Sequence, residues 1–226
     1  MYSHTPIEAA CHHNNNGILL LQSGKAGMAV KEFKQALAQM QRHLERVQDL
    51  PEGISFDSDD ESYNMMEVSM LVDERFYVYN RAMHFILPEE DKLQKSSACF
   101  IYSSIILLNV ALATHVAGLQ GLEVDEGKAL VQAARLYDSV ISLIQSHQMQ
   151  SDIAIFLLVM SINNQSLIMF DLGNCDVARK QYQALMQSSQ KLHQTGYWTT
   201  LGAERIFEEF MLNAFFMKSA VTAASA

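Results

Sequence analysis

No charged side chain occurs between Lys95 and Glu123, and most residues from Ala98 to Gly118 are apolar. About twenty apolar residues suffice to span a bilayer as a helix, so this stretch belongs either in a membrane or in a protein core. Several polar side chains lie along it, and each would carry an insertion cost in lipid. We therefore predict a helix buried in the core, with membrane anchoring as the alternative. The polar residues are Ser103, Ser104, Asn109, Thr114 and His115.

The composition favours a globular helical chain in a reducing compartment. Of 226 residues, 49% are hydrophobic and 18% are charged, which is enough apolar material for a sizeable core. The net charge of -9 has the wrong sign for coating nucleic acid or an anionic membrane surface. Three cysteines cannot form a complete disulfide framework, so we expect a cytoplasmic protein, with the nucleus as the alternative.

Hydrophobic periodicity predicts an all-α fold of antiparallel helical hairpins in one domain, residues 1–226. Gly24 and Gly173 stand where the hairpins turn, and Ser151 is a candidate N-cap. The predicted segments are hairpins at 7–48, 96–147 and 151–192, an acidic loop at 51–64, an irregular segment at 65–95, a capping segment at 197–217 and an Ala-rich tail at 218–226.

Two segments rich in aromatic residues break the helical pattern. Phe76–Ile86 carries aromatic and β-branched side chains that favour a strand, and Phe207–Met217 is the similar stretch that could pair with it. We predict one short two-stranded β element from these two segments. The alternative is that both are short amphipathic helices closing the ends of the core.

A spacing of small and aromatic residues recurs three times. The small residues would let the two helices of a hairpin approach closely, and the aromatics one turn later would fill the space between hairpins. The third copy carries an insertion in its turn. The copies are Gly17, Gly24, Ala29 and Phe33; Ser166, Gly173, Ala178 and Tyr182; and Ala111, Gly118, Ala133 and Tyr137.

At these residues the chain resembles the tetratricopeptide repeat family, in which antiparallel helix pairs stack into an α-α superhelix. The resemblance implies a protein-interaction scaffold or adaptor, with a groove lined by the first helix of each pair. Mapped through the repeat, the groove would bind a protein or peptide partner through Asn14, Ile18, Gln22, Asn109, Leu112, His115, Asn163, Asn164 and Leu167.

None of these groove residues is Lys or Arg, so the family's charged clamp on a peptide's terminal carboxylate is not expected. A groove this apolar would suit an amphipathic helix, or be filled by the protein's own segments. Its asparagines are the more informative residues, because Asn can hydrogen-bond a peptide backbone whatever the side chains of that peptide.

Catalytic and metal-binding patterns are not evident, so we expect no enzyme, no cofactor and no metal. His12 and His13 are adjacent to Cys11, but neighbouring residues on a helix point in different directions and cannot converge on one ion. Ser58, with Glu61 three residues later, is a candidate phosphorylation site; the alternative is a solubilising loop.

Two other functions stay open. The apolar first helices could leave surface uncovered and drive self-association into a homo-oligomer. An apolar ligand such as a lipid could instead occupy a pocket between 98–118 and 153–172. The interaction scaffold is the leading hypothesis.

Overall fold

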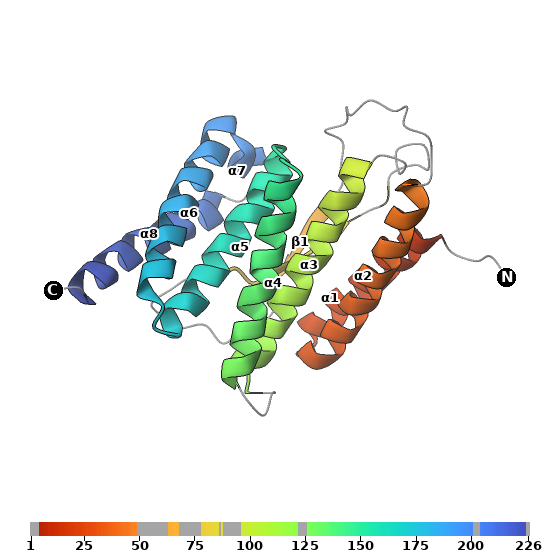
Figure 1. Ribbon diagram of the computed structural model, residues 1–226, viewed down its shortest axis with the longest axis horizontal. Coiled ribbons are helices and arrows are strands. Elements are labelled where there is room, and N and C mark those ends of the chain that lie inside the picture. Colours follow the sequence, from red (N-terminus) through yellow and green to blue (C-terminus); the bar gives the residue numbers. More distant parts are fainter. Residues whose placement is uncertain are drawn as a thin grey trace. The chain divides into compact units, whose positions relative to one another are not determined.

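The computed structural model describes residues 5–48, 63–67, 78–85, 87, 96–121, 126–200 and 204–224. They belong to two compact units, which are treated separately below. The first unit comprises residues 1–70 and 80–129, and the second comprises 71–79 and 130–226. The predicted all-α fold with one short β element is confirmed (Figure 1).

The first unit is built on three helices, α1 (Pro6–Gln22), α2 (Ala26–Gln48) and α3 (Ser96–Leu119). A capping box begins α1, because the Thr5 side chain accepts from the Glu8 N–H while the Glu8 carboxylate accepts from the Thr5 N–H. Gly24 takes a φ of +73° in the turn to α2, as predicted for a glycine at a helix end. Figure 1 draws α1 and α2 side by side.

Close packing of α1 on α2 depends on Gly17. A Cβ at this position would lie 2.5, 2.7 and 2.9 Å from three ring carbons of Phe33, which real packing does not allow. The predicted close approach at Gly17 is therefore confirmed. The fully buried Phe33 ring lies over Gly17 of its own hairpin.

The β element is an antiparallel pair, β1 (Tyr63–Glu67) and β2 (Arg81–Phe85). Part of the predicted Phe76–Ile86 segment is therefore a strand, but its partner lies upstream in the chain. The predicted partner, Phe207–Met217, lies inside a helix, α8. Its buried residues Ile206, Phe210 and Ala214 recur every four positions, a helical spacing.

The second unit contains most of α4 (Glu126–Ser146), followed by α5 (Asp152–Asp171), α6 (Cys175–Thr195), α7 (Tyr197–Thr200) and α8 (Glu204–Ala224). The predicted cap at Ser151 is confirmed, since its hydroxyl accepts from the Ala154 N–H. Gly173 has a φ of +77° in the turn between α5 and α6. Helix α8 extends to Ala224, so residues 218–224 of the predicted tail are helical.

The remaining sequence predictions concern the acidic loop and the two most apolar helices. Ser58 and residues 51–62 of the predicted acidic loop lie outside the described residues. Two described helices, at Ala98–Leu119 and Asp152–Asp171, are long and apolar enough to cross a membrane. Both are mostly buried within the protein, over 89% and 83% of an 18-residue apolar stretch in each, and a core helix of a soluble protein has the same character.

Candidate functional site

Four of the predicted groove residues hydrogen-bond to the backbone of the protein's own chain, each within its own unit. Asn14, Asn109 and Asn164 are fully buried and bind the backbone of the extended segment at residues 78–85. Gln22 is half-buried and its amide donates to the carbonyl of Glu67 in β1, at 3.1 Å. The remaining predicted groove residues are buried side chains: Ile18, Leu112, His115, Asn163 and Leu167.

In the first unit, two asparagines hold the backbone of Met83 in β2. Asn109 Oδ1 accepts from the Met83 N–H at 2.9 Å, and Asn109 Nδ2 donates to the Met83 carbonyl at 2.6 Å. Asn14 Nδ2 donates to the same carbonyl at 3.1 Å, and Asn14 Oδ1 accepts from Asn109 Nδ2 at 2.9 Å. We call Asn14 and Asn109 the first clamp.

The first clamp replaces a third strand. Backbone groups along a strand point alternately to its two sides, so the N–H and C=O of Met83 share one side of β2. Asn109 satisfies both with one planar amide, as a residue of a neighbouring strand would. Cys11 Sγ donates to the Phe85 carbonyl at 3.2 Å, two residues further along β2. Burial raises the pKa of this thiol, which keeps it in the protonated form that donates.

The second unit repeats the same geometry at another residue. Asn164 Oδ1 accepts from the Tyr79 N–H at 2.8 Å, and Asn164 Nδ2 donates to the Tyr79 carbonyl at 2.8 Å. Tyr79 is fully buried. We call Asn164 the second clamp. The two clamps hold the backbone of a tyrosine and of a methionine in the same way, so the contact does not depend on the side chain held.

Buried polar side chains orient the second clamp. Asn163 Nδ2 donates to Asn164 Oδ1 at 3.1 Å, and Asn213 Nδ2 donates to Asn163 Oδ1 at 2.8 Å. Asn164 Nδ2 also donates to the Tyr137 hydroxyl at 3.0 Å. Burial is the main cause that raises the pKa of Tyr137, while the bond to Asn164 lowers it. Asn163, a predicted groove residue, therefore positions the clamp.

The repeat places the two clamps at one equivalent position. Asn109 lies two residues before the small residue Ala111 of its copy, and Asn164 lies two residues before Ser166. The recurring spacing therefore brings the same amide to the same face of α3 and of α5. The sequence identified these amides, but it did not identify Tyr79 and Met83 as the residues that they hold.

Side chains of β2 are buried on both faces of the strand, and two of its five residues are partly exposed. In the first unit Ala82, Met83 and Phe85 are fully buried, whereas Arg81 and His84 are half-buried. The Phe85 ring stacks on Tyr102 of α3, with centroids 4.5 Å apart and planes 21° apart. The backbone contacts are thus accompanied by packing that depends on residue type.

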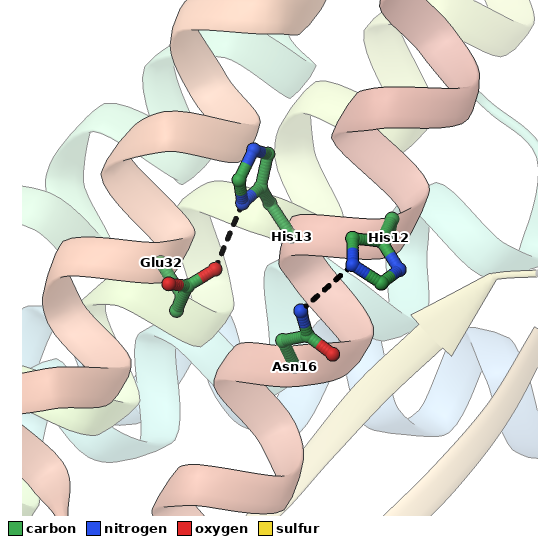
Figure 2. Close-up of polar contacts among 4 residues, drawn as sticks. All are labelled: His12, His13, Asn16 and Glu32. Atoms are coloured by element: carbon green, nitrogen blue, oxygen red, sulfur yellow. Dashed lines mark hydrogen bonds and ion pairs between the residues drawn. The ribbon is translucent and has the colours of Figure 1, made fainter. Parts of the chain in front are cut away.

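A separate group of polar side chains surrounds the two adjacent histidines of α1, His12 and His13 (Figure 2). His13 Nδ1 contacts a Glu32 carboxylate oxygen at 2.8 Å, and Asn16 Nδ2 contacts His12 Nε2 at 3.0 Å. The two imidazoles therefore serve different partners, as expected from their adjacent positions on a helix. Glu32 and Asn16 also line an open hollow of about 330 Å³ with Leu19, Leu20 and Ser23. Within the described ranges, no group of three His, Cys, Asp or Glu residues could hold a metal ion.

His115 is a buried titratable group in the predicted groove. It lies in α3 with 2% of its surface exposed, and burial lowers its pKa to about 4. The imidazole is therefore neutral near pH 7. It cannot supply a positive charge for a carboxylate ligand, which agrees with the absence of Lys and Arg among the predicted groove residues.

No protein-family model, curated protein or solved structure matches this chain.

Proposed function

We propose that the protein is a non-enzymatic interaction scaffold that binds an extended peptide by its backbone. The observation that supports this is the bidentate contact of Asn109 with the N–H and C=O of Met83. A side-chain amide that bonds both groups of one residue recognises an extended chain without reading its side chain. The proposed ligand takes the place of β2, between β1 and the first clamp.

The protein's own segment competes for this place. A tethered segment acts at an effective concentration of about millimolar, so a free peptide binds only if it is present above that level or the segment is weakened. The apparent affinity for a partner is therefore the affinity of the open site multiplied by the fraction of time that the site is open. In this proposal β2 is the resident occupant that a partner replaces.

The test uses the full chain with its own segment weakened by Phe85→Ala, which removes the ring that stacks on Tyr102. A labelled peptide of residues 80–87, with the original sequence, is titrated into this variant and followed by fluorescence anisotropy. We expect saturable binding, and weaker binding to the wild-type chain, whose segment is intact. Circular dichroism confirms that both chains are folded.

Two matched controls test whether the backbone is what the clamp reads. A peptide N-methylated at Met83 lacks the N–H that Asn109 accepts, and Asn109→Ala in the Phe85→Ala chain removes the amide. Each loses hydrogen bonds to buried groups, for which we expect at least about tenfold weaker binding. Equal binding of the methylated peptide, or no binding to a folded Phe85→Ala chain, would contradict the proposal.

A further inference from the structure

The residues around β2 in the first unit indicate which peptide sequences the proposed site would prefer. We infer that the partner is an extended segment with a basic residue, a small residue, an unbranched apolar residue, any residue and an aromatic residue in succession. This inference rests on the proposed function, because it assumes that a ligand binds in the same position and register as the protein's own strand Arg81–Phe85. The surroundings of each residue in this strand indicate which side chains the site accepts at that position.

The aromatic position has the most specific surroundings. Phe85 is fully buried and stacks on Tyr102, which is itself fully buried in α3. A stacked aromatic pair adds to the free energy of burying the ring, and a smaller side chain would leave a void against Tyr102. The ligand therefore needs a planar ring at this position, two residues after the one that the first clamp holds.

The small and the unbranched positions follow from burial on both sides of the strand. Successive side chains of β2 point to opposite faces, and both Ala82 and Met83 are fully buried. A side chain larger than Ala at the first of these positions would overpack its face. Met at the second is fully buried, and its flexible, unbranched side chain can adapt to the space available to it.

The basic position follows from charge. Arg81 lies opposite Glu67 in the β1–β2 register, and opposite charges at paired positions attract. Glu67 is exposed, so the attraction is modest, but the net charge of -9 adds a long-range preference for a cationic peptide. His84, half-buried and opposite Asn64, meets no such charge in the register and marks the unrestricted position.

The test measures dissociation constants of substituted 80–87 peptides on the full-length Phe85→Ala chain. We expect Phe85→Ala in the peptide to bind about 100-fold more weakly and Ala82→Leu about tenfold more weakly. Arg81→Glu should bind about threefold more weakly, and Glu67→Lys in the protein should reverse that preference. The His84→Ala peptide is the matched control and should bind like the original.

Two results separate this inference from the proposed function. If the substituted peptides bind as the original does while the N-methylated peptide does not, the inferred sequence preference is wrong and the proposed function stands. If no peptide binds the folded chain, both are wrong. Should Phe85→Ala fail to fold, the same peptides are added in excess to the wild-type chain. Hydrogen exchange at the protein's own Met83 amide should then accelerate with the original peptide and stay unchanged with the peptide Phe85→Ala.

Discussion

The amide of Asn109 satisfies backbone groups that would otherwise lose their partners in the core. Replacing Asn109 with Ala removes the acceptor for the Met83 N–H and the partner of Asn14 Oδ1. Because buried unsatisfied groups cost about 1–3 kcal/mol each, we expect Asn109→Ala to lower the free energy of unfolding by about 2–4 kcal/mol in urea.

Asn16→Ala is the matched control, because among the described residues the Asn16 side chain bonds to His12 alone, in an exposed contact. Its expected effect lies within about 0.5 kcal/mol. Similar losses for the two variants would mean that the first clamp contributes little to stability.

Position 17 needs a glycine because the Phe33 ring occupies the space that a Cβ would fill, and not because of its backbone angle. Gly17→Ala would force a Cβ to within 2.5 Å of Phe33, so we expect a loss of about 1–3 kcal/mol in thermal or urea unfolding. Gly27→Ala in α2 is the control, since no atom of the described part of the chain lies within 4 Å of an added Cβ there. It should be neutral, or stabilising by up to about 1 kcal/mol. In the double variant Gly17→Ala/Phe33→Leu, part of the loss should be recovered; strict additivity of the two changes would argue against the clash.

Among the helices, α5 and α6 provide a matched pair of N-termini. Ser151 at the start of α5 accepts from the Ala154 N–H, whereas Asn174 at the start of α6 makes no side-chain capping bond. We expect Ser151→Ala to cost about 1 kcal/mol of unfolding free energy, and Ser151→Asp to retain most of it. Asn174→Ala should cost less than Ser151→Ala. A larger loss of unfolding free energy for Asn174→Ala than for Ser151→Ala in chemical denaturation would show that side-chain capping does not determine the stability of these two helix N-termini.

Helices were predictable from the sequence because their signals are local. Apolar periodicity, Gly24, Gly173 and Ser151 each act within a few residues of the helix end that they define. The partner of β2 was not predictable in this way. Tyr63–Glu67 has neither β-branched residues nor alternation, and its pairing with β2 depends on contacts with residues distant in the chain. The aromatic richness of 207–217 suggested a strand, but its buried residues follow the period of a helix.

The clamps were predictable only in part, for the same reason. The repeat spacing brought Asn109 and Asn164 to the groove face, and the affinity of Asn for peptide backbones followed from its chemistry. Their actual partners lie 26 and 85 residues away along the chain. No local pattern links Asn164 to Tyr79. That these amides hold the backbone of the chain itself therefore had to come from the structure.

Over the whole molecule, buried histidine makes stability depend on pH. In the unfolded chain the pKa of His115 is about 6.5, and burial lowers it to about 4 in the folded state. The unfolded state thus binds more protons between these values, so stability is retained above about pH 6.5 and falls as the pH drops toward 4. The pKa of His84 is also lowered by burial, which adds in the same direction.

For His115 alone we expect a loss of about 3 kcal/mol between pH 7 and pH 4. The measurement is urea unfolding across this range for the wild type and for His115→Gln, which cannot take up the proton. The variant should show a smaller fall in unfolding free energy with decreasing pH. Parallel curves for the two proteins would exclude His115 as the origin of the dependence.

The chain passes from the second compact unit to the first between Tyr79 and Asn80, inside the segment that the clamps hold. The sequence predicted one domain over residues 1–226, whereas the contacts divide the chain into two compact units. Each unit holds its own part of the segment, the first through Asn14 and Asn109 and the second through Asn164. Changes at Asn109 and at Asn164 therefore report on separate sets of contacts, and each should be assessed in its own unit.

The way Asn109 covers Met83 also bears on aggregation. A two-stranded sheet has open edges, and an open edge can recruit strands from other molecules into amyloid-like assemblies. Here the side of β2 that faces α1 and α3 is closed by side chains of Asn14, Asn109 and Cys11. Any event that frees β2 exposes this edge. Partner exchange and fibril growth would then compete for the same backbone groups.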